Sequence, residues 1–110
     1  MSLKKSAEIS WFAPICDGDD DFLGNRNPLY KSSWENTCKI VQTADKLGYK
    51  NVLCPSSFQV GQDSLSFVAA MSNLTKNINF LPAVRCGEIY PPMLARTIAT
   101  IDHKIGRAHV

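Results

Sequence analysis

The sequence lacks any long apolar run, and none approaches the roughly 20 residues that a membrane-spanning helix needs. The amino-terminal segment Met1–Ser10 contains Lys4 and Lys5 but not the apolar stretch of a secretory signal. The net charge is only +2, and the basic residues are scattered rather than interleaved with aromatic ones. This distribution argues against nucleic acid and anionic membrane as partners. We therefore predict a cytoplasmic protein that binds neither of them.

Cysteine pairs of the Cys-x-x-Cys type are also absent, because Cys16, Cys38, Cys54 and Cys86 stand far apart. A zinc ribbon or thioredoxin-type site is therefore not indicated. Two disulfides would suit a secreted protein, but without a secretion signal we predict four free thiols in a reducing compartment. His103 has no metal-binding partner four residues away, so we expect an ordinary histidine at a helix end and no metal site.

The common phosphate-binding and nucleophile motifs, G-x-G-x-x-G, the Walker loop and G-x-S-x-G, are missing as well. An acidic loop contains Asp17, Asp19, Asp20 and Asp21. Its spacing lacks the glycine and glutamate that complete an EF-hand, so we interpret it as a solvated loop rather than a calcium site. Motifs alone thus predict no catalytic residue.

Three short apolar segments are typical of buried strands: Glu8–Ile15, Asn51–Cys54 and Asn77–Val84. Pro82 lies within the third segment and predicts a bulge or an early end there. Helical patterns follow each segment. A capping box of Ser32 and Glu35 predicts the start of the first helix.

The apolar spacing of the first helix is regular, and Gly48 supplies its stop. Its repeating positions are Trp34, Cys38, Val41 and Ala44, with Ile40 and Leu47 alongside. Asp63 predicts the cap of a second helix, with apolar residues Leu65, Val68, Ala69 and Leu74. Pro91 and Pro92 suit the first turn of a third helix, which carries Leu94, Ile98 and Ile101.

The alternation of strands and helices predicts βαβ units and a parallel sheet, in either a (β/α)₈ barrel or a doubly wound fold. A complete barrel needs about 250 residues, so 110 residues hold only about three of its eight units. In both architectures ligands bind at the carboxyl ends of the strands. The loops that follow the strands are Cys16–Leu29, Pro55–Gln62 and Arg85–Tyr90.

Ser56 and Ser57 stand in the second of these loops, where their hydroxyls are candidates for hydrogen bonds to a cofactor or for a simple turn. Arg85 opens the third loop, and its guanidinium suits a phosphate, sulfonate or carboxylate. An ion pair with Glu88 is the alternative for Arg85. Cys54 ends a strand, and we interpret it as a buried, inert thiol rather than a reactive one.

Five segments together resemble the bacterial-luciferase-like, flavin-dependent monooxygenases, most closely the alkanesulfonate monooxygenases. They are Ile9–Pro14 (ISWFAP), Ala44–Tyr49 (ADKLGY), Asp63–Met71 (DSLSFVAAM), Asn77–Arg85 (NINFLPAVR) and Pro91–Asp102 (PPMLARTIATID). Each segment alone is a weak signal, but five in order at the family's spacings are specific. Where the sulfonate branch has a cysteine after its second strand, this chain has none.

The resemblance implies the amino-terminal three βα units of an incomplete (β/α)₈ TIM barrel. It implies reduced FMN supplied by a separate NAD(P)H-dependent flavin reductase, and the oxidation of a small organosulfur substrate by O₂ to sulfite and an aldehyde. By position, Ser56 and Ser57 would bind the cofactor and Arg85 the substrate. The full-length protein would be a homo-oligomer and the fragment inactive. A small non-catalytic α/β binding domain, or a family member with another substrate or a deazaflavin, remains open.

The carboxyl-terminal residues depart from the family pattern. Residues 1–103 fit the partial barrel domain, whereas Gly106 and Arg107 arrive one residue too early. The residues Ile105–Val110 also match the translation of a common sequencing adapter (ATCGGAAGAGCACACGTC). We therefore hypothesise that residues 104–110 are adapter read-through, with a natural one-residue deletion as the alternative.

Overall fold

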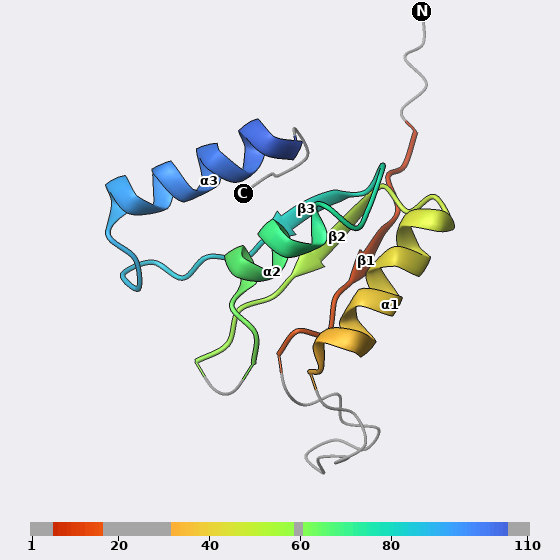
Figure 1. Ribbon diagram of the computed structural model, residues 1–110, viewed down its shortest axis with the longest axis horizontal. Helices are drawn as coiled ribbons and strands as arrows, with labels where there is room; N and C mark the ends of the chain where they lie inside the picture. Colours follow the sequence, from red (N-terminus) through yellow and green to blue (C-terminus); the bar gives the residue numbers. More distant parts are fainter. Residues whose placement is uncertain (1–5, 17–31, 59–60, 106–110) are drawn as a thin grey trace, which may run out of the picture.

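A computed structural model describes residues 6–16, 32–58 and 61–105, and strands and helices alternate along it (Figure 1). The elements are β1 (Ser10–Phe12), α1 (Trp34–Lys46), β2 (Asn51–Cys54), α2 (Ser64–Met71), β3 (Asn79–Pro82) and α3 (Pro91–Ile105). The strands form a parallel sheet in the order β1-β2-β3. The predicted α/β order is confirmed. Strand β2 coincides with its predicted segment, whereas β1 and β3 are shorter than theirs. The acidic loop at residues 17–21 and the tail at 106–110 lie outside the described residues.

The two faces of the sheet differ in what covers them. Paired residues of a parallel sheet point to the same face, so Val52 and Phe80 share one face and Leu53 lies on the other. Val52 and Phe80 are fully buried in one apolar cluster with α1, α2 and Ile101 of α3. Phe12, the partner of Leu53 in β1, is 52% exposed, and Leu53 is 40% exposed. The helices therefore cover one face and leave an apolar row open on the other.

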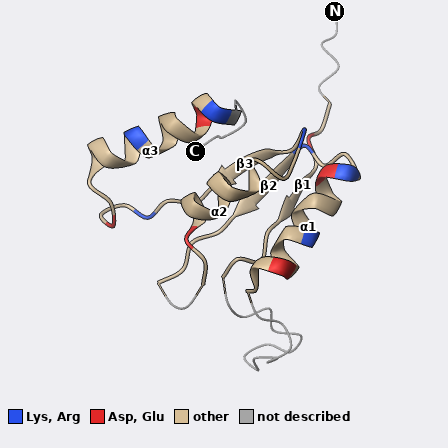
Figure 2. Cartoon of the chain, in the orientation of Figure 1, with Lys and Arg blue, Asp and Glu red and all other residues tan. Residues whose placement is uncertain are grey.

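A polar row lies on the same open face, at the amino ends of the strands. The side chain Nδ2 of Asn51 donates to Ser10 Oγ at 3.3 Å and to Glu8 Oε2 at 3.1 Å. Asn79 Nδ2 in turn donates to Asn51 Oδ1 at 3.3 Å. The strands carry no charged residue, and the charges of the described chain lie on helices and connections (Figure 2). Uncharged amides and hydroxyls thus link the three strands across this face.

The start of α1 corrects the predicted capping box. The N-cap is Ser33, whose hydroxyl accepts a hydrogen bond from Asn36 N at 3.2 Å. The hydroxyl of Ser32 instead donates to the carbonyl of Ile15 at 2.6 Å. Ser32 is therefore engaged in holding the segment after β1 and cannot cap the helix. The predicted stop is confirmed, because Gly48 follows α1 with a positive φ of 85°.

Helix α2 begins as predicted and ends earlier. The carboxylate of Asp63 caps it by accepting from Ser66 N at 2.8 Å. The helix ends at Met71, so the prediction that Leu74 belongs to it is wrong, and Leu74 is 45% exposed. Ala69 also faces solvent, and Phe67 and Met71 join the predicted Leu65 and Val68 in the core. Helix α3 begins at Pro91 as predicted.

Pro82 ends β3, as the sequence predicts. Asn79 N donates to Lys50 O at 3.0 Å and Ala83 N donates to Cys54 O at 2.8 Å. Since alternate residues of a strand point their N–H groups to opposite sides, the ring nitrogen of Pro82 faces away from β2. The proline therefore breaks no bond within this sheet and removes one donor from its outer edge.

The carboxylate of Asp45 joins the end of α1 to the segment that leads into β3. It accepts three backbone hydrogen bonds, from Lys76 N at 2.7 Å, Asn77 N at 2.9 Å and Ile78 N at 2.8 Å. Hydrogen bonds to a charged acceptor are stronger than those between neutral groups. This single side chain therefore fixes where β3 begins relative to α1.

We expect the substitution Asp45→Asn to lower the free energy of unfolding by about 2 kcal/mol, because an amide offers one acceptor oxygen to three donors. Urea denaturation measures the effect. The matched control is Asp102→Asn, an exposed carboxylate on α3, which should change stability by no more than about 0.5 kcal/mol. Equal effects of the two substitutions would contradict the role given to Asp45.

Candidate functional site

Three loops leave the carboxyl ends of the strands, and the structure brings residues from all three together. Arg85 follows β3, and its Nη2 donates to the carbonyl of Ser56, after β2, at 2.9 Å. Burial raises the pKa of the Cys16 thiol, after β1, and the charge of Arg85 lowers it to a smaller extent. Phe58 lies in the β2–α2 loop beside Ser56. We call these four residues the carboxyl-edge cluster.

Phe58 covers one face of the Arg85 guanidinium. The central guanidinium carbon lies 3.7 Å from the centroid of the ring, a cation–π contact. The ring itself is 79% exposed. Sequence reasoning missed this residue, because no spacing rule connects a loop aromatic with an arginine 27 positions later. The available signal was the presence of an aromatic in one of the three ligand-side loops.

Arg85 retains hydrogen-bonding capacity in this setting. Its Nε is buried and has no acceptor among the described residues. A buried donor without an acceptor costs about 1–3 kcal/mol, so such an atom points to a missing partner. The alternative ion pair with Glu88 is not formed between these two residues. The two residues are joined instead by a long backbone hydrogen bond of 3.5 Å from Glu88 N to Arg85 O.

The two predicted cofactor serines occupy the same loop as Phe58. Ser56 is half-buried and gives its carbonyl oxygen to Arg85, while Ser57 is exposed. Both therefore lie at the ligand-binding edge that the sequence predicts. The contacts of their hydroxyls with a cofactor stay a prediction.

The four cysteines are free. Burial raises the pKa of the Cys54 thiol to about 12, so this thiol is protonated at neutral pH, in keeping with the inert role predicted for it. Burial also raises the pKa of Cys16, with a smaller opposing effect of the Arg85 charge. His103 is exposed on α3. Within residues 6–16, 32–58 and 61–105, no group of three histidine, cysteine or acidic residues could hold a metal.

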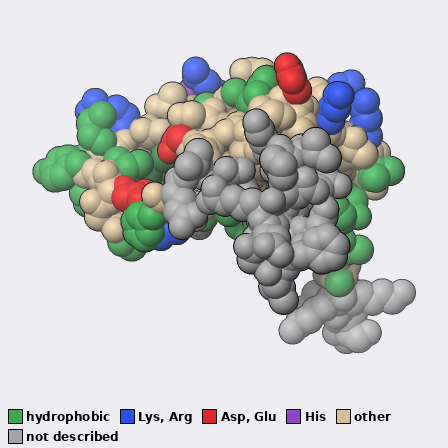
Figure 3. Space-filling model, turned by 90° about the horizontal axis from the view of Figure 1, so that it is seen from below, with side chains coloured by type: hydrophobic (Ala, Val, Ile, Leu, Met, Phe, Trp, Pro, Cys, Tyr) green, Lys and Arg blue, Asp and Glu red, His purple; other side chains and the backbone are tan. Residues whose placement is uncertain are grey.

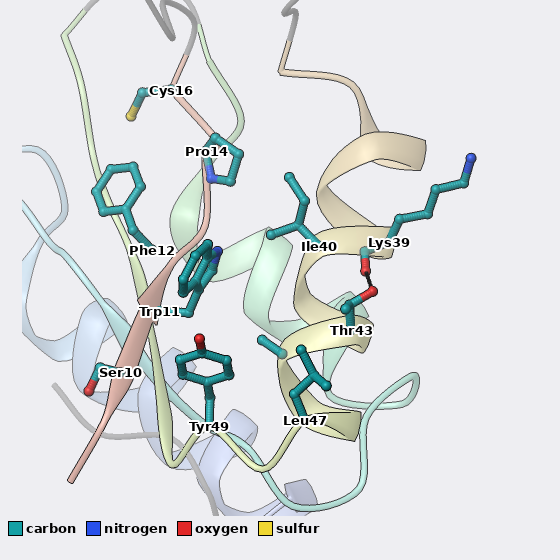
Figure 4. A pocket seen from close by; sticks show the side chains of 11 residues that line it. Ser10, Trp11, Phe12, Pro14, Cys16, Lys39, Ile40, Thr43, Leu47 and Tyr49 are labelled. Carbon is teal, nitrogen blue, oxygen red and sulfur yellow. Dashed lines mark hydrogen bonds between the residues drawn. The ribbon is translucent and has the colours of Figure 1, made fainter. Parts of the chain in front are cut away.

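A groove of about 780 Å³ runs between β1 and α1 (Figure 4). Trp11 and Tyr49 border it, with ring centroids 5.2 Å apart and ring planes at 63°. Ile40 of α1 and Leu47, just past the end of that helix, face these rings (Figure 4). Lys39 is the one charged residue of its described lining. The groove offers packing surface and no acid–base pair, so the carboxyl-edge cluster is the better candidate for ligand chemistry.

Exposed apolar side chains of the described residues mark a different part of the surface. Exposed Tyr90 and Met93 mark the start of α3, and hydrophobic side chains gather at that end of the molecule (Figure 3). None of the described helices is long and apolar enough to cross a membrane.

Comparisons with known proteins place the chain in a family. Residues 8–108 match the family described as luciferase-like monooxygenase. The sulfoquinovose monooxygenase of Agrobacterium fabrum (strain C58) is 52% identical over 100 residues, which cover 91% of this chain and 26% of that protein. The sulfoquinovose monooxygenase of Novosphingobium aromaticivorans is 43% identical over 103 residues, which cover 94% of this chain and 28% of that protein.

One solved structure has a similar fold. It is a type II Baeyer–Villiger monooxygenase, the oxygenating constituent of 3,6-diketocamphane monooxygenase from the CAM plasmid of Pseudomonas putida, in complex with FMN. The TM-score is 0.69 at 21% identity, and the match covers 96% of this chain and 29% of that one. The predicted α/β fold of three βα units is thereby confirmed. The chain spans about a quarter of the length of the curated relatives it matches, and it belongs to the luciferase-like monooxygenase family.

The cysteines should differ sharply in reactivity. Exposed Cys86 should react with iodoacetamide near pH 8, whereas Cys54, with a pKa of about 12, should stay unmodified until the chain unfolds. Mass spectrometry of the digested protein measures both rates, with and without denaturant. In denaturant the two thiols should react alike. Equal rates in the folded protein would show that Cys54 is accessible.

Proposed function

From its membership of the luciferase-like monooxygenase family, we propose that this chain is part of a reduced-FMN-dependent enzyme that oxidises a sulfonated organic substrate with O₂ to sulfite and an aldehyde. The observation that supports this most is that the buried Nε of Arg85 has no acceptor among the described residues. A sulfonate oxygen is an acceptor of the required charge. The 52% identity to a sulfoquinovose monooxygenase points to the same class of substrate.

We further propose that residues 1–103 form the first three units of a (β/α)₈ barrel. In such a barrel the open face of the sheet becomes the interior. Phe12 and Leu53 would then pack against strands that follow, and the free edges of β1 and β3 would gain partners. The boundary of this domain at residue 103 stays a prediction.

The carboxyl-edge cluster and the residues next to it have side chains that suit a flavin. Ser56 and Ser57 supply hydroxyls, Arg85 supplies a cation, and Phe12 and Leu53 supply open apolar surface on the face that leads to this edge. Reduced FMN, when bound, provides the activation of O₂. The serines would hold the cofactor, Arg85 would hold the sulfonate, and the apolar row would exclude water. A separate NAD(P)H-dependent reductase and a homo-oligomeric full-length protein complete the proposal.

A chimaeric enzyme tests this function in a complete protein. The 100 matched residues of the Agrobacterium fabrum sulfoquinovose monooxygenase are replaced by their counterparts from this chain. We expect sulfite release from sulfoquinovose that requires reduced FMN and O₂, with the parent enzyme as control. A folded chimaera that neither binds reduced FMN nor releases sulfite would overturn the proposal. If the chimaera binds reduced FMN but releases no sulfite, only the proposed sulfonate substrate is refuted.

Within this chimaera, Arg85→Met should raise the KM for the sulfonate by roughly 10- to 100-fold, because a charge-assisted hydrogen bond to the anion is lost. Arg85→Lys should restore part of the affinity, since it keeps the charge and loses the planar donor pattern. Steady-state kinetics measure both. Arg96→Met removes an exposed arginine of α3 and is the matched control. An unchanged KM in Arg85→Met would exclude Arg85 from substrate binding.

A further inference from the structure

Two contacts fix the guanidinium of Arg85 in different directions. The hydrogen bond from Nη2 to the carbonyl of Ser56, at 2.9 Å, holds one end of the group. The ring of Phe58, 3.7 Å from the guanidinium carbon, closes one face. A hydrogen bond alone leaves the plane free to rotate about its axis, and stacking alone leaves the group free to slide. Together they determine both its position and its plane.

We propose that Phe58 is a positioning residue that sets the plane of Arg85, so that an oxyanion binds in this plane through the unpartnered Nε. This inference rests on the anion-binding role proposed for Arg85. The β2–α2 loop supplies the aromatic ring of Phe58 to one face of the guanidinium and the carbonyl oxygen of Ser56 to Nη2. Nε is left as the donor without an acceptor among the described residues.

The exposure of Phe58 supports a role other than packing. At 79% exposure the ring contributes little to the apolar core. The contact that this ring makes among the described residues is with the cation of Arg85. The substitution Phe58→Leu therefore removes the π face without opening a cavity in the core. It should leave the fold intact.

A direct contact between Phe58 and the substrate is the competing explanation. The two differ in their dependence on Arg85. If Phe58 acts through Arg85, its removal has no effect once Arg85 has been replaced. If Phe58 touches the substrate, its removal weakens binding with or without the arginine. A double-mutant cycle therefore separates the two explanations.

The experiment uses the chimaeric enzyme with two readouts: calorimetric binding of methanesulfonate without flavin, and steady-state turnover of sulfoquinovose. We expect Phe58→Leu to weaken methanesulfonate binding and raise KM by about two- to fivefold, the range of a cation–π contact, with kcat unchanged. Phe58→Tyr, which keeps the π face, should restore both values. In the Arg85→Met background, Phe58→Leu should add nothing.

Three outcomes would overturn the proposal: unchanged binding in Phe58→Leu, a loss in Phe58→Tyr as large as in Phe58→Leu, or an equal loss in the Arg85→Met background. The anion-binding role of Arg85, on which this proposal rests, is tested by a separate outcome. If Arg85→Met binds methanesulfonate as well as the unsubstituted chimaera does, Arg85 is not the anion site. If Arg85→Met weakens binding and Phe58→Leu does not, Arg85 keeps its role and Phe58 loses the one proposed here.

Discussion

The carboxylate of Asp45 holds the arrangement on which the candidate site depends. By accepting three backbone N–H groups just before β3, it sets the residue at which that strand begins. The pairing of Asn51 with Asn79 follows, and the same register carries the chain to Arg85 three residues after the strand ends. A guanidinium that must reach the carbonyl of Ser56 at 2.9 Å tolerates no slip in this register. Local hydrogen bonding on the helix side thus controls geometry at the opposite end of the sheet.

The sheet separates stability from ligand chemistry by its two faces. Buried residues such as Val52 and Phe80 pack beneath the helices and supply most of the apolar contact. The strands carry no charge on the open face, which presents Phe12 and Leu53 next to the loops that hold Arg85. A ligand can therefore be accommodated at the loops without disturbing the packed face. Such a division explains how parallel α/β folds vary their chemistry through loops alone.

Sequence reasoning was strongest where a residue acts on its own neighbours. Asp63 caps the helix that follows it, and Gly48 stops the helix before it, since both effects depend on local backbone geometry. The failures involve contacts between distant segments. Ser32 was predicted to cap α1, but its hydroxyl is bonded to Ile15, 17 residues away. The contact of Phe58 with Arg85 was missed for the same reason, so the position of the site was predictable and its internal geometry was not.

The linked amides of Asn51 and Asn79, with the hydroxyl of Ser10, have a consequence for how the nascent chain assembles. Side chains alternate between the two faces of a sheet. A slip of one residue in either pairing would therefore turn an amide toward the apolar cluster, where it would lose its hydrogen-bond partners. The observed register is therefore strongly favoured, even though each strand has only three or four residues. During folding, the row should therefore favour the observed alignment of all three strands over one that is shifted by a residue.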